Sequence, residues 1–169
     1  SLSVIGDNCA IDECIACNYL ITNPPDLVIN VVDASNLERQ LYLTAQLLEM
    51  QIPVVVALNM MDMAKRRGIH IDIAQLSRSL HCPIISLTAI HGFGIAELRR
   101  ALLVIPQTNS TLPYSFAPLL QGALQTLTEK LAPKNLPRPW LALRLLEEDR
   151  LARHYTSAEE LSHVTVLIQ

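Results

Sequence analysis

Two short polar motifs, each directly after an apolar run, hold the side chains best suited to bind a ligand. Asn59-Met60-Met61-Asp62 follows one run, and Thr88-Ala89-Ile90 follows another. Guanine presents two adjacent donors, its N1 proton and its 2-amino group, which one carboxylate can accept together, and adenine has no such pair. Asp62 is therefore predicted to select guanine, because an unpaired buried polar group costs about 1–3 kcal/mol, and more when charged.

The residues around Asp62 complete the predicted base site. Asn59 can bond to the edge of the base and brace the neighbouring loops, and the backbone amide of Ala89 can reach the guanine oxygen. Thr88 and Ile90 belong to the same predicted loop. The alternative interpretation is that Asn59 and Asp62 only cap the helix that follows.

Three apolar runs must position these motifs: 26–33, 53–58 and 82–87. They are rich in β-branched residues and mostly continuous, which favours strands of a parallel sheet that is covered on both faces. Helical patterns separate them, and Ser35 to Glu38 has the spacing of a capping box. The sequence predicts a doubly wound α/β fold, in which ligands bind beyond the carboxyl ends of the strands.

The pattern changes near Pro106, where a polar, proline-punctuated segment reads as a linker. Beyond it only helical stripes follow, one containing Trp140, and Ser157 to Glu160 forms a second capping box. We therefore predict two domains, residues 1–107 with the sheet and residues 112–169 as a small all-helical unit.

Composition narrows the classes of function. The chain has 169 residues, a formal charge of −3 and 13 Lys and Arg spread along it, which argues against a nucleic-acid partner. No apolar run reaches the ~18–20 residues of a membrane span, so the chain itself is expected to be soluble.

Cys9, Cys14 and Cys17 match part of an iron–sulfur spacing, but their helical periodicity favours core cysteines. No metal ligand and no catalytic residue is assigned.

The two polar motifs, together with Asp33-Ala34-Ser35-Asn36, resemble the cytosolic GTPase domain of the ferrous iron transport protein B family. The resemblance is strong over residues 10–105, and the helical tail resembles the helical domain that leads to that family's membrane part. It implies a P-loop GTPase-like fold, GTP or GDP as ligand, and a place on the cytoplasmic face of the bacterial inner membrane within a multi-pass Fe(II) importer. Met60 stands where most GTPases have Lys, and its thioether can lie against a base.

The chain departs from that family in its phosphate-binding elements. None of its five glycines is followed by Lys, so there is no G-x-x-x-x-G-K-[ST], and no Asp has a Gly three residues on, so D-x-P-G is absent too. The family's first switch is not visible either. We expect a fragment that carries only the base-recognition half of the site, is inactive alone, and would use Mg²⁺ only in the complete domain.

The elements missing from this chain have two expected consequences, and two other interpretations of its function stay open. The family's first strands would be missing, so the run 26–33 would form an apolar sheet edge that favours self-association. In the whole protein, the membrane domain of the same transporter would be the partner. The alternatives are a catalytically dead interaction module that uses the helical tail, and an unrelated doubly wound enzyme whose loops mimic a guanine motif.

Overall fold

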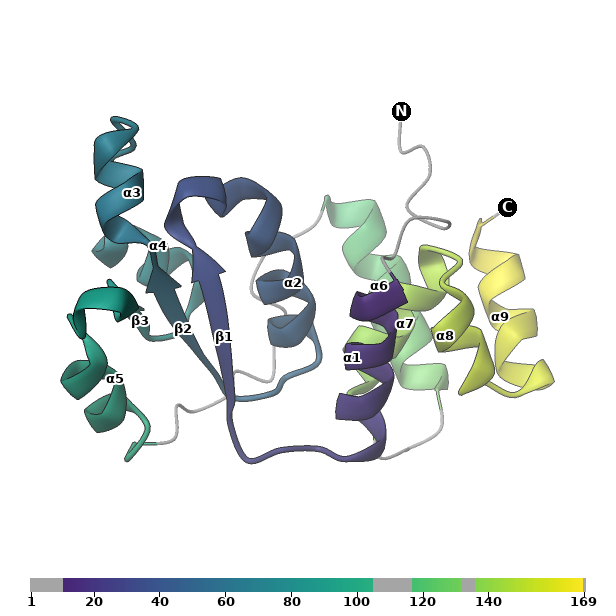
Figure 1. Cartoon of the computed structure of the whole chain (residues 1–169). Helices are drawn as coiled ribbons and strands as arrows, with labels where there is room; N and C mark the ends of the chain where they lie inside the picture. Colours follow the sequence, from purple (N-terminus) through teal and green to yellow (C-terminus); the bar gives the residue numbers. More distant parts are fainter. Residues whose placement is uncertain (1–10, 105–116, 132–135, 169) are drawn as a thin grey trace. The chain divides into compact units, whose positions relative to one another are not determined.

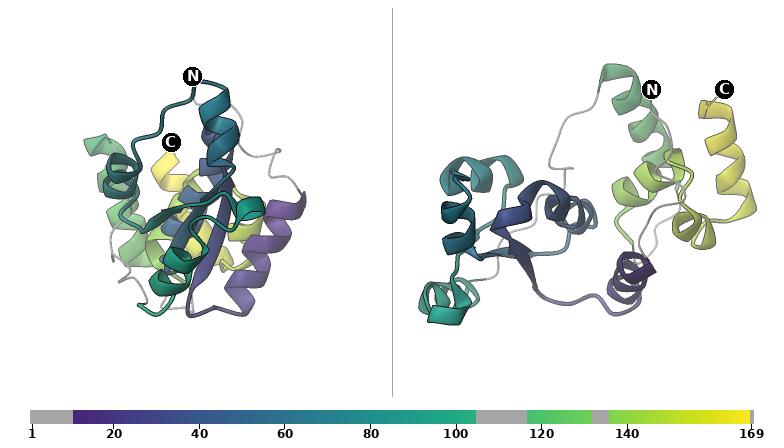
Figure 2. Two further views of the ribbon diagram at one scale, coloured as in Figure 1. Left: turned by 60° about the vertical axis from the view of Figure 1, so that its left-hand side comes forward. Right: turned by 45° about the horizontal axis from the view of Figure 1, so that its top comes forward.

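The computed structural model describes residues 11–104, 117–131 and 136–168. By its internal contacts the chain divides into two compact units. Residues 25–113 form one unit, and residues 1–24 with 114–169 form the other. Figures 1 and 2 show the elements of both units.

A three-stranded parallel sheet forms the centre of the first unit, in the order β1-β2-β3 (Figure 1). Its strands are β1 (Val28–Asp33), β2 (Val54–Asn59) and β3 (Ile84–Ser86). Val28 pairs with Val54, and Val56 pairs with Ile84. The three predicted strands and their parallel direction are thereby confirmed.

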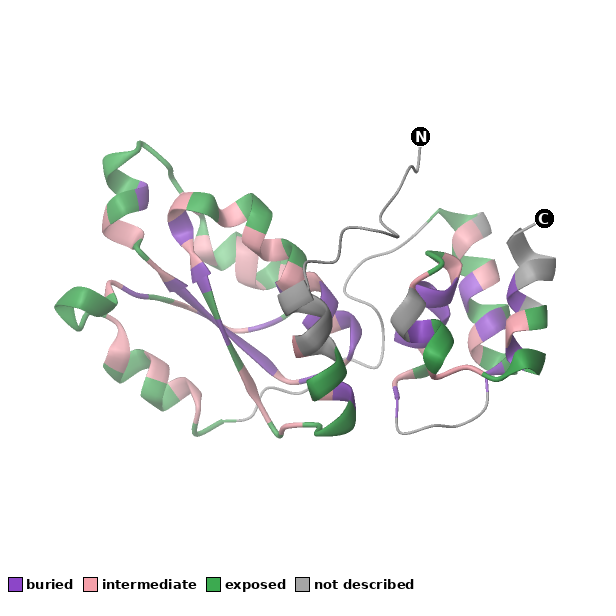
Figure 3. Cartoon of the chain, turned by 45° about the vertical axis from the view of Figure 1, so that its right-hand side comes forward, coloured by how far each residue is buried: buried purple, intermediate pink, exposed green. Residues whose placement is uncertain are grey.

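The middle strand carries the core of this unit. Residues 54–58 of β2 are all buried, with at most 1% of their surface exposed (Figure 3). A strand covered on both faces reads as a continuous apolar run rather than an alternating one, which is the pattern Val-Val-Val-Ala-Leu shows. The edge strand β1 alternates instead, and its Ile29 and Val31 are exposed.

Helices connect the strands and continue after them: α2 (Leu37–Glu49), α3 (Met61–Arg66), α4 (Ile73–Leu80) and α5 (Ile95–Ala101). One buried polar pair fastens α2 to the sheet, since the Asn30 side-chain amide on β1 donates to Thr44 Oγ1 on α2 at 2.8 Å. A buried amide without such a partner would be costly, so this bond fixes how α2 lies against β1.

The capping box predicted at Ser35 is wrong. The Asp33 carboxylate accepts the Ser35 N–H at 2.8 Å and starts a 3₁₀ turn, η1 (Ala34–Asn36). The helix α2 then begins after Asn36, whose side chain makes no capping bond. Asp33 sits two residues before Ser35, so its carboxylate takes that amide first and the chain is committed to a turn.

The second unit is all-helical: α1 (Ile11–Thr22), α6 (Pro118–Lys130), α7 (Arg138–Leu146), α8 (Arg150–His154) and α9 (Ala158–Ile168). Its core includes α7, where Trp140 is 3% exposed. The second capping box is confirmed, because the Glu160 carboxylate accepts the Ser157 N–H at 2.8 Å and Ser157 Oγ accepts the Glu160 N–H at 3.3 Å.

The helix α1 belongs by its contacts to the helical unit. Within that unit the Tyr155 hydroxyl donates to Asn18 Oδ1 on α1 at 2.7 Å. The predicted domain boundary between 107 and 112 stays a prediction, and the compact units differ from it in residues 1–24. Across the part of the chain that the structure describes, no helix is both long and apolar enough to cross a membrane.

Candidate functional site

Two loops meet at the carboxyl end of the sheet and form the candidate site. The first follows β2 and contains Met60, and the second follows β3 and includes the 3₁₀ turn η2 (Ala89–His91). The Leu87 N–H donates to the Leu58 carbonyl at 2.7 Å, and the Met61 N–H donates to the Leu87 carbonyl at 3.3 Å. The two loops are therefore held together by main-chain bonds as well as by the strands beneath them.

Asn59 provides the side-chain link between these loops. Its Oδ1 accepts the Ala89 N–H at 3.1 Å. Asn59 was predicted to brace the loops, and the Ala89 amide was predicted to reach the guanine oxygen. In the structure the two groups bind each other. An amide that already has an acceptor is fixed in direction, so Asn59 sets the orientation of the peptide at Ala89.

Met60 turns the chain sharply between strand and helix. Its φ of 59° and ψ of 33° lie in the left-handed region, which is uncommon for residues other than glycine. Its side chain is 46% exposed. Because Met is not β-branched, it can hold this conformation at modest cost and present its thioether to solvent or to a ligand.

Asp62 lies in the first turn of α3 and is half-buried. Among the described residues its carboxylate makes neither a hydrogen bond nor an ion pair. The cap residue of α3 is Met60, with no side-chain capping bond, and Asn59 is engaged by Ala89. The alternative that Asn59 and Asp62 only cap this helix is therefore wrong, and the oxygens of Asp62 are available to an external donor.

The second loop closes on itself. The Thr88 N–H donates to the Phe93 carbonyl at 3.2 Å, and the Gly92 N–H donates to the Ala89 carbonyl at 3.0 Å. Inside this loop Ile90 is 86% exposed, so it contributes little to the core. Its position leaves it free to cover a ligand at the end of the sheet.

Gly94 ends the loop in a position that sequence reasoning missed. Its φ is +81°, and a Cβ there would overlap the carbonyl oxygen of Ser86 and come within 2.7 Å of Leu87 Cδ2. The main chain of the loop therefore packs directly against β3. A glycine just before a predicted helix is compatible with a positive φ, but it does not by itself indicate such a close approach.

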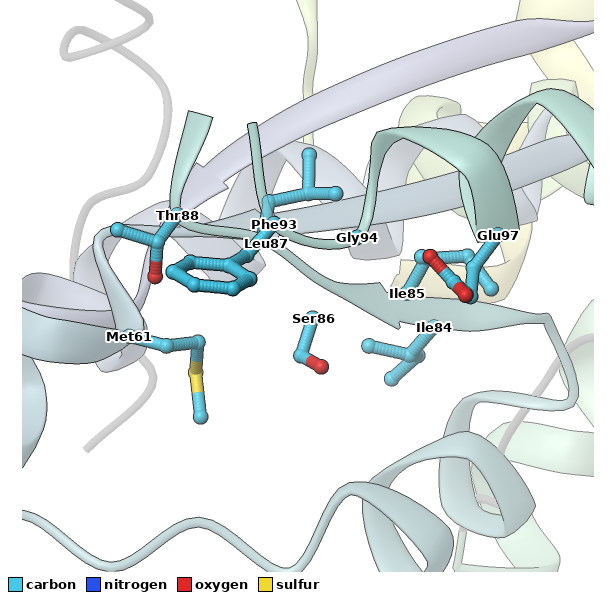
Figure 4. Close-up of a pocket in the computed structure, with 9 residues that line it drawn as sticks. All are labelled: Met61, Ile84, Ile85, Ser86, Leu87, Thr88, Phe93, Gly94 and Glu97. Atoms are coloured by element: carbon cyan, nitrogen blue, oxygen red, sulfur yellow. The ribbon is translucent and has the colours of Figure 1, made fainter. Parts of the chain in front are cut away.

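An open cavity of about 540 Å³ lies along the outer side of β3. Figure 4 shows Met61 and the Phe93 ring on one side of Ser86, with Ile84 and Glu97 toward the other end. Of the residues predicted to contact guanine, only Thr88 lines it. The cavity is thus beside the predicted base site and does not coincide with it. The base site predicted at Asn59, Asp62 and Ala89 stays a prediction. Of its polar groups, Asn59 Oδ1 and the Ala89 N–H bind each other, and the Asp62 carboxylate has no partner among the described residues.

The described residues offer no set of side chains that suits a metal ion. No three His, Cys, Asp or Glu side chains gather into a metal site within the described ranges. Burial raises the pKa of the Cys82 thiol to about 11, so this cysteine is a protonated core residue at neutral pH. Cys9 lies outside the described residues, as do the side chains of Cys14 and Cys17.

The sheet and its loops define an α/β domain of the P-loop GTPase class. The protein-family model of ferrous iron transport protein B matches residues 3–102. The Fe(2+) transporter FeoB of Escherichia coli strain K12 is 45% identical over 159 residues, which are 92% of this chain and 20% of that protein. The chain belongs to the ferrous iron transport protein B family, and the predicted resemblance is confirmed.

Solved structures agree with this assignment. A GDP-bound mutant of S. thermophilus NFeoB matches with a TM-score of 0.82 at 30% identity, over 94% of this chain and 64% of that one. The cytosolic domain of L. pneumophila FeoB matches with a TM-score of 0.80 at 40% identity, over 92% of this chain and 62% of that one. The chain thus spans about a fifth of the length of the curated relatives and somewhat under two thirds of these solved domains.

Removing the Asn59 side chain should loosen the second loop. We expect Asn59→Ala to raise the hydrogen-exchange rate of the Ala89 amide about fivefold, since one net hydrogen bond contributes about 1 kcal/mol. Asn59→Asp keeps an acceptor oxygen and is the matched control, with exchange close to that of the unchanged protein. Equal protection of Ala89 in all three proteins would show that Asn59 does not hold this loop.

Proposed function

We propose that this chain recognises the guanine base of GTP or GDP through the two loops at the end of its sheet. The observation that carries the proposal is the half-buried Asp62 carboxylate, which has no partner among the described residues. Two adjacent N–H donors of guanine would satisfy both of its oxygens. Asn59 and the Thr88–Ile90 loop would meet the base edge, and Met60 would lie on its face.

The relatives support a guanine nucleotide as the ligand. The S. thermophilus NFeoB mutant is described as bound to GDP, and a further S. thermophilus structure as bound to GMPPNP. In the complete domain Mg²⁺ would accompany the phosphates. This chain has no G-x-x-x-x-G-K-[ST] and no D-x-P-G, the elements that hold phosphate and metal, so we assign it base recognition and not hydrolysis.

Family membership supports a proposal for the role of this chain in a longer protein. We propose that the chain is part of the guanine-nucleotide-binding region of an Fe(II) transporter, on the cytoplasmic face of the bacterial inner membrane, with that transporter's membrane domain as its partner. Membership of the family removes the alternative of an unrelated enzyme. We propose too that two copies of this chain associate through the exposed edge of its sheet.

A nucleotide titration of the isolated chain tests base recognition. We expect GDP to shift the amide resonances of Asp62 and Ala89 with a Kd in the millimolar range, because the phosphate contacts are missing. ADP should bind about tenfold more weakly, since it leaves the Asp62 carboxylate unpaired. Micromolar affinity for GDP would contradict a half-site, and equal affinity for ADP would contradict guanine recognition.

A further inference from the structure

A basic segment between β2 and β3 takes no part in the candidate base site. Lys65, Arg66 and Arg67 follow one another at the end of α3, and residues 63–71 contain no carboxylate. All three residues are exposed, and within the described ranges none of them forms an ion pair. The chain as a whole has a formal charge of −3, so the three cations form a local region of the opposite sign.

The main chain after α3 holds this basic segment in a defined shape. The Ile69 N–H donates to the Ala64 carbonyl at 3.0 Å, and the Gly68 N–H donates to the Lys65 carbonyl at 3.1 Å. With Gly68 at a φ of +72°, these are the two bonds of a Schellman motif, which satisfies carbonyls at the end of a helix. The cations therefore stand on a built turn of the fold.

The basic segment faces away from the core of its unit. Ala64 is the buried residue of α3, with 1% of its surface exposed. Arg66 comes two residues later, about 200° around the helix, so it lies on the outer side. Figure 1 shows α3 standing beyond the arrowhead of β2. The family's further strands would lie beside β1, on the side away from β2, whereas α3 follows β2 and leads toward β3.

Two accessible apolar side chains accompany the cations. Met63 is 36% exposed and Ile69 is 37% exposed. The Arg66 guanidinium lies near the first of them, with Nη1 3.9 Å from the Met63 sulfur. Together these side chains form a basic patch that consists of Met63, Lys65, Arg66, Arg67 and Ile69. Helices at a membrane interface combine the same two kinds of group, because the cations meet lipid headgroups and the apolar groups enter the boundary below them.

We propose that the basic patch binds a membrane surface that carries anionic lipids. Each Lys or Arg near such a surface strengthens binding about fivefold, so three of them together give on the order of 100-fold. This is a weak contact for a free chain. In a polypeptide that is also held at the membrane elsewhere, the effective concentration of the surface is high, and a weak contact suffices to orient the domain. The inference rests on the proposed place at the cytoplasmic face of a membrane and is independent of nucleotide recognition.

The shape of the basic patch favours a flat surface over an acidic peptide. Peptides bind along exposed sheet edges or in grooves. The patch belongs to a short helix and its C-terminal turn, and none of its residues lines the cavity along β3. A projecting helix such as α3 can instead present several side chains to a flat surface at once.

Vesicle binding by the full chain tests the basic patch. Vesicles of equal parts phosphatidylglycerol and phosphatidylcholine, at low salt and without nucleotide, should sediment with the chain, and pure phosphatidylcholine vesicles should not. We expect the double variant Lys65→Gln, Arg66→Gln to bind about 25-fold more weakly, because two cations are lost. The double variant Arg99→Gln, Arg100→Gln removes the same charge from the last turn of α5 and should weaken binding less than about threefold. Circular dichroism verifies that each variant is folded.

A tryptophan in the basic patch tests whether its partner is lipid. Met63→Trp adds one indole, and the natural Trp140 is buried in the helical unit. On the anionic vesicles we expect the added emission to shift to shorter wavelength and to be quenched by brominated lipid, because indole rings favour the membrane–water boundary. Polyglutamate at the same concentration of charge should produce neither change.

The outcomes separate this inference from the proposed base recognition. Absence of binding to anionic vesicles at low salt, or equal weakening by the two double variants, would overturn the membrane contact. Tighter binding to polyglutamate than to vesicles would overturn it too and would assign an acidic peptide to the patch. The GDP titration contains no lipid, so vesicle binding by a chain that does not bind GDP would leave this inference standing and overturn base recognition alone.

Discussion

Gly94→Ala should lower the free energy of unfolding by about 3 kcal/mol or more, the largest effect that we expect from an alanine at any of the described glycines. The left-handed φ of +81° alone costs an L-residue about 1–2 kcal/mol. In addition, the new Cβ would overlap the Ser86 carbonyl oxygen, which is main chain and cannot rotate away. The loop must then move off β3, so the cost exceeds that of the dihedral strain. Urea denaturation measures the difference.

Gly92→Ala is the matched control. Gly92 lies in the same loop, with a φ of +71°, but a Cβ there meets nothing within 4 Å. We therefore expect a loss of about 1 kcal/mol, from the backbone conformation alone. Similar losses in the two variants would mean that the approach of the loop to Ser86 does not limit stability. If Gly94→Ala also removes the Asn59–Ala89 bond, the exchange of the Ala89 amide will increase with it.

The strands and the place of the two polar loops could be predicted because both depend on local pattern. Residues 54–58 form a continuous apolar run, which is what a doubly covered strand requires. Polar residues directly after such a run, as at Asn59 and Thr88, must lie at the carboxyl edge of a parallel sheet. The sequence therefore located the two loops, although it could not show that Asn59 already binds the Ala89 amide.

The two capping boxes show where local pattern fails. Ser157 and Glu160 form the predicted box, whereas Ser35 and Glu38 do not. The difference is Asp33, whose carboxylate captures the Ser35 amide before a helix can start there. A four-residue motif cannot report a competing acceptor that lies just outside it.

Met60 and Gly94 were beyond prediction for a different reason. The left-handed turn at Met60 and the contact of Gly94 with Ser86 both depend on where β2 and β3 place the loops in three dimensions. Neither residue type at these positions indicates the conformation by itself, since most Met residues have negative φ and most glycines have open space beside them. Such positions become visible only after the sheet is assembled.

Asp62→Asn should change which base the chain prefers. A carboxylate accepts both guanine donors, the N1 proton and the 2-amino group. An Asn amide has one acceptor and one donor, so its NH₂ group would face the 2-amino group of guanine. Xanthine carries an oxygen in place of that amine and matches the amide. We expect the Kd for GDP to rise at least ~10-fold, about 1.4 kcal/mol, and the Kd for xanthosine diphosphate to fall below it.

Asp26→Asn is the control for this charge change. Asp26 is exposed, lies before β1 in the same unit, and has no hydrogen bond or ion pair among the described residues. Asp26→Asn removes one negative charge, as Asp62→Asn does. Any general electrostatic effect on an anionic nucleotide would therefore appear in both variants. Only a direct contact with the base can reverse the order of GDP and xanthosine diphosphate, because the two ligands carry the same phosphates. An unchanged order in Asp62→Asn would remove Asp62 from the base site, and with it the observation on which guanine recognition depends.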